Sequence, residues 1–315
     1  MSLLLGSPAD RWPLPQAVDA LVDSARRAGI PGPIWIAGVL YPSLNLSWDL
    51  VRSMLGAVER STGIELPGAA GTGDLVGLFL PRPIALGEDG FWAALGVFLV
   101  SLPLLLVYYR LVVGLARVCD PLRPPDEPGR PRCGDLRSAW REGRGLGFAG
   151  LGMCVLLLGL LLAAMLVLIG PLVMLVQILG LEELSPLFVG LLAPVLLVLL
   201  LYTVVLLVVN QLALHSLAHN RRGIASALTH AWRLIRTSPW SAARATSMDL
   251  VLFVTVLAIT TAIGSVLAAT VVMRPLYFLV VTALYGFAGV TRAGFWARSY
   301  RALGGLSAAD QVPGL

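Results

Sequence analysis

Residues 147–179 read GFAGLGMCVLLLGLLLAAMLVLIGPLVMLVQIL, a stretch that contains no charged side chain. A helix that crosses a bilayer needs about 20 consecutive apolar residues. This stretch has 33 residues, which exceeds one crossing, and Pro171 is expected to kink the helix or to end it. The stretch therefore predicts a transmembrane helix, and with it an integral membrane protein.

The composition extends this prediction to most of the chain. Hydrophobic residues make up 57% of the 315 residues and charged residues only 13%, whereas a soluble domain carries roughly 25% charged residues. Residues 91–113, 187–214, 248–273 and 275–290 are also apolar enough to be spans. Residues 34–55 are less apolar, because they include Asp49 and Arg52, and they either cross the membrane or lie kinked at its surface.

The arginines indicate how these spans are oriented. All 23 basic residues are arginine, and they flank the apolar stretches. The net charge of +5 is therefore better explained by orientation in a membrane than by nucleic-acid binding. If residues 34–55 cross and the N-terminus is cytoplasmic, 18 arginines fall on the inner side. The positive-inside rule then favours an all-α, polytopic fold of six spans, arranged as three hairpins with both termini in the cytoplasm.

A short motif recurs before two of the predicted hairpins. Ala139-Trp140-Arg141 is followed by Arg144, and Ala231-Trp232-Arg233 is followed by Arg236, at an offset of 92 residues. A weaker copy covers residues 24–27. Such self-similarity predicts one membrane domain, residues 1–315, built from repeats at 17–115, 135–214 and 224–291. Residues 119–133, rich in proline and arginine, form the predicted cytoplasmic linker.

Each repeat is expected to begin with an amphipathic helix at the membrane surface. Ile224, Leu228, Trp232 and Ile235 recur at helical spacing, as do four apolar residues between 18 and 25. Arginines occupy much of the opposite side, and tryptophan is a common interfacial anchor. The alternative interpretation is a chance match of two short motifs in a chain rich in alanine and arginine. The predicted lipid-contacting residues are Trp140, Arg141, Arg144, Trp232, Arg233 and Arg236.

The phrase Ala231-Trp232-Arg233-Leu234-Ile235-Arg236-Thr237-Ser238-Pro239, followed by a hairpin of spans, resembles a group of bacterial multi-pass membrane families. These include uncharacterised families and the membrane domain fused to some glycerophosphoryl diester phosphodiesterases. The resemblance covers the layout of residues 15–300. It implies a six-helix module in the bacterial cytoplasmic (inner) membrane. The phosphodiesterase activity does not transfer, because the soluble catalytic domain is missing from this sequence.

Two groups of residues raise the question of a chemical site. His215 and His219 are four residues apart and share a helix face, so they are either metal ligands, with Asp249 as a third, or polar residues at the membrane boundary. Asp49 and Asp249 are ionisable residues at the edges of spans. Either they take part in transport, or each pairs with a nearby arginine. Cys119 and Cys133 fall in the predicted cytoplasmic loop, so no structural disulfide is expected between them.

The sequence lacks the signatures of common enzyme classes. It has no lysine for a Walker-type loop, no GxSxG elbow and no HExxH motif. The leading interpretation is a non-enzymatic membrane protein, without a cofactor, that organises anionic lipids or partner proteins through basic interfacial helices. The partner is a protein or a second copy of the chain. The alternative is a transporter or channel for a small solute.

Overall fold

The computed structural model describes residues 12–29, 32–39, 41, 88–120, 135–179, 186–267 and 273–306. Every regular element in these residues is a helix, in agreement with the all-α prediction. The helices are α1 (Leu14–Ala28), α2 (Ile34–Val39), α5 (Glu88–Val118), α6 (Leu136–Glu142), α7 (Gly147–Leu179), α8 (Pro186–Asn220), α9 (Ile224–Thr237), α10 (Pro239–Leu267) and α11 (Arg274–Ala302).

Four of these helices, α7, α8, α10 and α11, are long and apolar enough to cross a membrane. This confirms the prediction of a membrane protein with several transmembrane helices. The arrangement as six spans in three hairpins stays a prediction, because residues 42–87, with Asp49, lie outside the described residues.

Several helices differ in length from the spans predicted from the sequence. Helix α7 continues through Pro171 to Leu179, so the proline does not end it; proline is tolerated in transmembrane helices because neighbouring groups satisfy the freed carbonyl. Helix α11 runs to Ala302, although the prediction ended at Val290 because an arginine follows. The arginines in its final turns bind acids from other helices and are therefore compatible with a buried helix.

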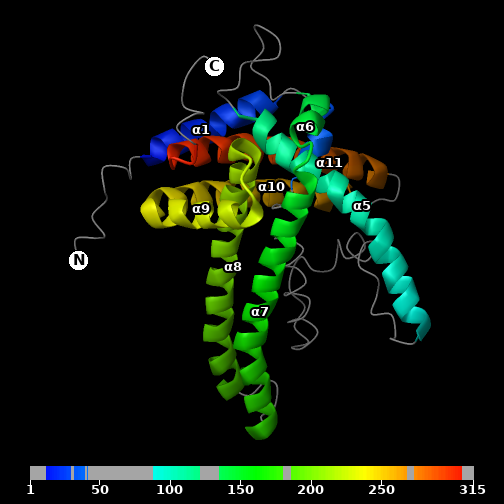
Figure 1. The fold of residues 1–315 in the computed structure, drawn as a ribbon, viewed down its shortest axis with the longest axis vertical. Coiled ribbons are helices and arrows are strands. Elements are labelled where there is room, and N and C mark those ends of the chain that lie inside the picture. Colours follow the sequence, from blue (N-terminus) through cyan, green and yellow to red (C-terminus); the bar gives the residue numbers. More distant parts are fainter. Residues whose placement is uncertain are drawn as a thin grey trace. The chain divides into compact units, whose positions relative to one another are not determined.

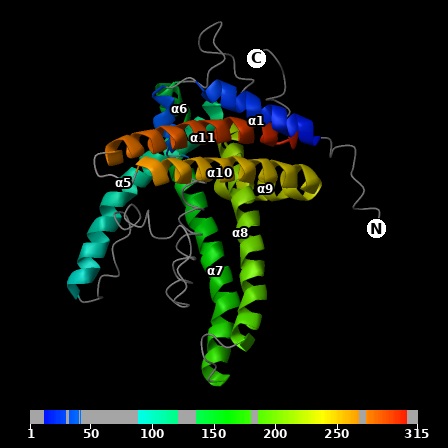
Figure 2. The same ribbon diagram turned by 180° about the vertical axis from the view of Figure 1, so that it is seen from behind.

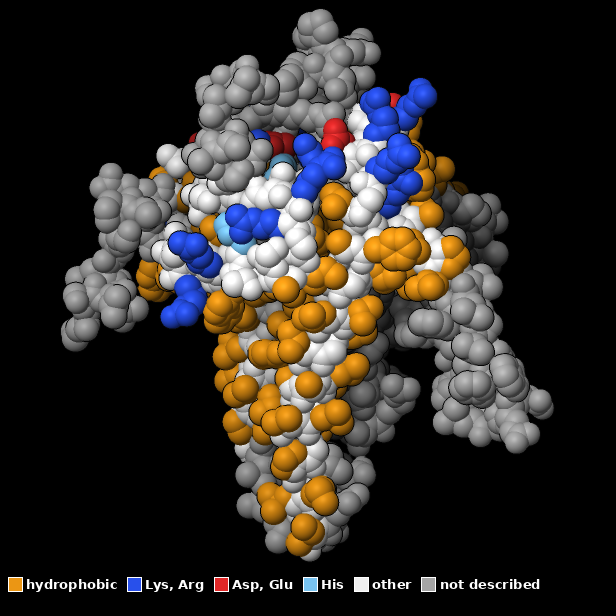
Figure 3. All heavy atoms as spheres, in the orientation of Figure 1, with side chains coloured by type: hydrophobic (Ala, Val, Ile, Leu, Met, Phe, Trp, Pro, Cys, Tyr) orange, Lys and Arg blue, Asp and Glu red, His pale blue; other side chains and the backbone are white. Residues whose placement is uncertain are grey.

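The chain forms two compact units. Unit 2 contains residues 42–106 and 156–206. Its described core is a hairpin in which α7 and α8 run side by side, and Figure 3 shows hydrophobic side chains along both helices. Tyr202 Oη donates a hydrogen bond to the Leu160 carbonyl oxygen across the hairpin at 3.4 Å. Many large side chains here are exposed, among them Leu166 and Val167 at 74% and 70%, as expected for a surface that faces lipid.

Unit 1 contains residues 1–41, 107–155 and 207–315, and it is built around the second half of α11. Helices α1, α2 and α10 all contact α11, and α1, α10 and α11 lie side by side in both ribbon views (Figures 1 and 2). From Ala288 to Ala297 almost every side chain of α11 is fully buried. In this respect α11 differs from α7, α8 and α10, whose apolar surfaces are mostly exposed.

Glycines allow α2 to approach α11 closely. A Cβ atom added to Gly38 would lie 2.1 Å from the Gly286 carbonyl oxygen, and one added to Gly289 would lie 1.9 Å from the Gly38 carbonyl oxygen. No side chain fits at those distances, so the two backbones are in direct contact. Small residues at such crossings are a common means of packing helices in membrane proteins.

Helices α1 and α9 each bury a face of small residues and leave larger apolar residues partly exposed. Helix α1 buries Ala17, Ala20, Ser24 and Ala28, whereas Leu14, Val18 and Val22 are between 41% and 50% exposed. Helix α9 buries Ala227, Ala231 and Leu234, and Trp232 is 48% exposed. The helical prediction for these segments is confirmed, and their location at a membrane surface stays a prediction.

Candidate functional site

The polar residues of unit 1 gather where α8 passes the central helix α11. Tyr41, which follows α2, is buried together with Gln211 and His215 of α8. The Tyr41 hydroxyl donates to Gln211 Oε1 at 3.0 Å and lies 3.4 Å from His215 Nε2. Because buried polar groups require hydrogen-bond partners, these contacts fix the position of α2 against α8.

Two histidines and a tyrosine form a stack beside this contact. The rings of His215 and His219 lie 5.7 Å apart and nearly parallel, as expected for residues one helical turn apart. Tyr300 of α11 stacks against both rings, at 6.0 Å and 5.9 Å. His230 of α9 meets the edge of Tyr300 at 6.1 Å. We call His215, His219 and Tyr300 the histidine–tyrosine stack.

The stack changes the interpretation of the two histidines. His215 is completely buried among other side chains, and its predicted position at the membrane boundary stays a prediction. A metal site requires a third ligand, and the described residues contain no group of three histidines, cysteines or acids that could hold a metal ion. Asp249, the predicted third ligand, binds Arg292 instead. The metal interpretation therefore remains a prediction without a complete ligand set.

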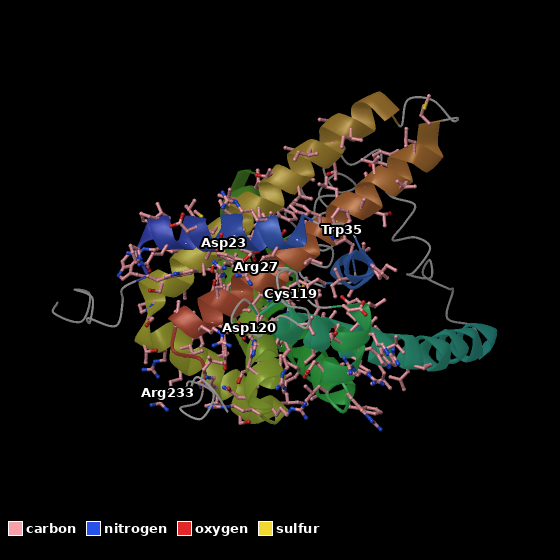
Figure 4. All side chains as sticks on the ribbon, turned by 90° about the horizontal axis from the view of Figure 1, so that it is seen from above. Asp23, Arg27, Trp35, Cys119, Asp120 and Arg233 are labelled. Carbon is pink, nitrogen blue, oxygen red and sulfur yellow. The ribbon has the colours of Figure 1, made fainter. Side chains whose placement is uncertain are left out.

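Asp120, just after α5, binds the C-terminal part of α11. Its carboxylate accepts hydrogen bonds from Arg301 Nε at 2.9 Å and 3.0 Å and from Arg301 Nη2, an arrangement in which the fork of the guanidinium matches the carboxylate. His219 Nδ1 lies 3.7 Å from the same carboxylate. Figure 4 shows Asp120 beside this end of α11. The ends of α5, α8 and α11 thus converge on one carboxylate.

Two glycines terminate α11 and connect it to α8 and α9. Gly304 adopts a φ of +78°, and the Gly304 and Gly305 amides donate to the Arg301 and Tyr300 carbonyl oxygens, which defines a Schellman motif. Asn220 Nδ2 donates to Tyr300 Oη at 2.9 Å and to the Gly305 carbonyl oxygen at 2.8 Å. The same carbonyl lies 3.1 Å from His230 Nε2. Since a carbonyl only accepts hydrogen bonds, this contact selects the tautomer with the proton on Nε2.

Asp249 of α10 and Arg292 of α11 form a buried ion pair. Arg292 Nη2 donates to Asp249 Oδ2, and the two side chains are only 7% and 10% exposed. Within the described residues, Asp249 Oδ1, Arg292 Nε and Arg292 Nη1 have no hydrogen-bond partner. Asp249 is predicted from the sequence to be a polar residue at the edge of a span, and the structure places it in a pair across the α10–α11 contact. Its charge is thus already neutralised by Arg292.

Two groups of arginines in unit 1 differ in their surroundings, and Arg26, Arg27 and Arg222 belong to neither group. One group binds acids, carbonyl oxygens or rings of other elements: Arg110, Arg117, Arg244, Arg292, Arg298 and Arg301. The other group is exposed on α6, α9 and the turns next to them and has no acidic partner among the described residues: Arg137, Arg141, Arg144, Arg221, Arg233 and Arg236.

The exposed arginines lie beside exposed tryptophans. Trp140 on α6 and Trp232 on α9 are 37% and 48% exposed, and Trp240 at the start of α10 is 54% exposed. Figure 3 shows basic side chains over α6 and α9 with hydrophobic ones next to them. In Figure 4, Arg233 points away from the surrounding helices. The structure thus brings together on one helix each tryptophan–arginine pair that the motif predicted.

Two titratable groups outside the spans have shifted pKa values. The hydrogen bond from Arg298 holds the pKa of Asp23 below its usual range, and partial burial opposes this effect. Burial lowers the pKa of His230, and the positive charges of Arg222 and Arg233 add to this shift, while the bond to the Gly305 carbonyl opposes it. His230 is therefore neutral in the folded protein at neutral pH.

Comparison of the chain with protein-family models, with curated proteins and with solved structures gave no match. The resemblance to bacterial multi-pass membrane families therefore stays a prediction from the sequence motif.

Proposed function

We propose that the chain is a non-enzymatic integral membrane protein that organises anionic lipids through the basic, tryptophan-bearing helices α6 and α9. The observation that carries this proposal is the division of the arginines. Arginines of the protein interior bind acids and carbonyls, whereas Arg141, Arg144, Arg233 and Arg236 are exposed and lack an acidic partner in the described residues. Exposed guanidinium groups next to exposed indoles match the chemistry of a lipid headgroup region.

The half-exposed apolar side of α9 supports a membrane-surface position. Ile224, Leu228 and Ile235 are neither fully buried nor fully exposed, and they share a face that borders Trp232. Arg233 and Arg236 lie further around the helix. A helix with this order of apolar, indole and basic residues lays its apolar side into the acyl boundary and keeps its charges among the headgroups.

The alternative function, transport of a small solute, has less support from the described residues. It requires ionisable side chains that face an aqueous pathway. Asp249 is buried and paired with Arg292, and the polar residues around Tyr300 bind one another. Asp49, the other candidate, lies outside the described residues, so a topology and uptake experiment with an Asp49→Asn variant would test that function separately.

The proposed function is tested by native mass spectrometry of protein released gently from membranes, followed by titration with phosphatidylglycerol. We expect the double variant Arg233→Gln/Arg236→Gln to retain less anionic lipid. Each basic residue near an anionic surface contributes about 1 kcal/mol. The loss of two such residues therefore weakens binding roughly thirtyfold.

The charge-conserving variant Arg233→Lys/Arg236→Lys is the matched control, and it is expected to keep most of the bound lipid. Zwitterionic phosphatidylcholine should bind the wild-type protein and both variants equally. If the glutamine variant copurifies with as much anionic lipid as the wild type, the proposed function is wrong.

A further inference from the structure

Arg110, near the end of α5, is held in one orientation by Trp140 of α6. Its guanidinium carbon lies 3.6 Å from the centre of the Trp140 ring, a cation–π contact. Its Nε donates to the Trp140 carbonyl oxygen at 3.0 Å. The stack and the hydrogen bond act on the same guanidinium, so the side chain is oriented before any ligand binds.

This arrangement leaves one edge of the guanidinium available. The indole covers one face and the Trp140 carbonyl takes Nε, whereas Nη1 and Nη2 have no hydrogen-bond partner among the described residues. Two adjacent N–H groups in one plane match two oxygens of a phosphate group. Arg110 therefore differs from Arg117, two turns further along α5, whose guanidinium binds Glu142 and the Ala218 carbonyl oxygen.

The backbone around this site is rigid because α5 and α6 touch directly. A Cβ atom added to Gly143 would lie 1.9 Å from the Arg110 carbonyl oxygen. One added to Gly114 would lie 1.8 Å from the Ala139 carbonyl oxygen. These two close approaches flank Trp140 and hold it at a fixed position relative to Arg110. Orientation in advance reduces the entropy that is lost when a ligand binds.

The charges around the site favour an anion. The acid of α6, Glu142, is already neutralised by Arg117 at 3.1 Å. Asp135, which precedes α6, is the other acidic group of this segment. The positive charges of Arg110 and of the exposed Arg141 and Arg144, which follow Trp140, outnumber this one acid.

Exposed aromatic side chains belong to the same segment of the chain as Trp140. Trp140 is 37% exposed, and Phe148, in the first turn of α7, is 74% exposed. Inorganic phosphate has no apolar part that could bury this surface, whereas the acyl chains of a phospholipid can bury it. The combination of an oriented guanidinium, excess positive charge and exposed aromatic rings selects a lipid as the occupant.

We propose that Arg110 and Trp140 form a specific site for the phosphate group of an acidic phospholipid, at the contact between α5 and α6. This proposal rests on the proposed function and identifies one residue, Arg110, that the recurring tryptophan–arginine motif does not include. The phosphate accepts from Nη1 and Nη2 of Arg110, Trp140 holds the guanidinium in place, and the exposed part of the Trp140 indole contacts the acyl chains.

The test is a native mass spectrometry titration of the full-length, delipidated protein with short-chain phosphatidylglycerol. The variant Arg110→Gln should lose one lipid-binding event, with an affinity decrease of about tenfold to hundredfold at that site. Arg110→Lys keeps the charge but lacks the planar fork, so it should not restore binding. Trp140→Leu removes the stack and should weaken the same event, although every charge is retained.

Arg137→Gln is the matched control, because it removes one exposed arginine of the same segment that has no tryptophan beneath it. The affinity of the lipid-binding event in this variant should stay within about threefold of the wild-type value. The thermal unfolding midpoint of each variant shows that it is folded. Competition with millimolar inorganic phosphate identifies the occupant, since a lipid site retains phosphatidylglycerol under these conditions.

Four outcomes are informative. Loss of one binding event in Arg110→Gln and in Arg110→Lys, but not in Arg137→Gln, supports the proposal. Equal losses in Arg110→Gln and Arg137→Gln, or full binding by Arg110→Lys, mean that charge alone acts and overturn it. Displacement of the lipid by inorganic phosphate overturns the assignment of a lipid as occupant. If the wild type retains no anionic lipid at all, the proposed function fails, which is distinct from a failure at Arg110 alone.

Discussion

Replacing Asp249 with alanine removes the carboxylate that Arg292 binds inside unit 1. The guanidinium is then left at 7% exposure without its acid, and its Nε and Nη1 already have no partner among the described residues. Breaking a buried ion pair by removing one partner costs about 3–5 kcal/mol, because the remaining charge is neither paired nor solvated. We therefore expect Asp249→Ala to be strongly destabilised.

The double variant Asp249→Leu/Arg292→Met separates the charge from the packing. It removes both ions and fills their volume with apolar side chains. Replacement of a whole buried pair by apolar residues is often neutral or stabilising. The double variant should therefore be close to the wild type in stability, even though it carries more substitutions than Asp249→Ala.

The assay is thermal unfolding of the purified protein in a mild detergent, followed by tryptophan fluorescence. A loss of about 4 kcal/mol lowers the midpoint by roughly 10 °C for a domain of this size. The double variant should recover most of this shift. If Asp249→Ala unfolds at the wild-type temperature, or if the double variant is as unstable as the single one, the pair is not a buried electrostatic contact and the reasoning is refuted.

Four further predictions concern Gly305, His230, Cys133 and Cys119. Gly305→Ala should lower stability by about 1–3 kcal/mol in the same unfolding assay, because the added Cβ would lie 2.5 Å from the Tyr300 ring. Stability should decline as the pH falls from the ordinary His230 pKa of 6.5 toward its lower value in the folded state, since the unfolded chain binds the proton more readily; a His230→Gln variant should lose this part of the pH dependence. An impermeant thiol reagent applied to intact cells should not label Cys133, which is predicted to be cytoplasmic, and labelling would reverse the predicted topology. Cys119 is buried, so it should react slowly even in solubilised protein.

The membrane class and the positions of the helices could be predicted from local patterns. The uncharged run in α7 and the helical spacing of apolar residues in α9 depend only on neighbouring residues, and both helices are present. The tryptophan–arginine motif likewise placed Trp140 and Trp232 on exposed helix positions. Such features are decided by side chains within a few turns of one another, which a single sequence displays directly.

The interior of unit 1 could not be predicted, because its contacts join residues far apart in the chain. Arg298 binds an acid 275 residues away and Arg301 one 181 residues away. From the sequence alone these arginines indicate a cytoplasmic loop, and only the distant acids explain why α11 continues through them. The burial of His215 could not be predicted for a similar reason, since its partner Tyr41 is 174 residues away.

The contact of Arg110 is less distant in the chain than those of Arg298 and Arg301, but it is not local either. Arg110 lies at the end of an apolar run, and its contact with Trp140 spans 30 residues across the predicted linker. A tryptophan in the first turns after such a linker is a weak signal for the contact. The glycines that allow α5 and α6 to approach closely do not reveal this contact in the sequence, because each lies far along the chain from the backbone that it meets.

The central position of α11 has a consequence for synthesis in the cell. Among the described residues, the helices that pack most extensively against it, α1, α2 and α10, precede it in the chain, and α1 ends at Ala28. At ~5–20 residues per second, the ribosome needs roughly 15 to 55 s to proceed from α1 to the end of α11. During that time α1 and α2, and α10 once it has been synthesised, expose the faces that α11 will later cover. Nascent chains of this protein should therefore depend on chaperones or on the translocation machinery until the helix at their centre emerges, and chains that stop before it should be degraded.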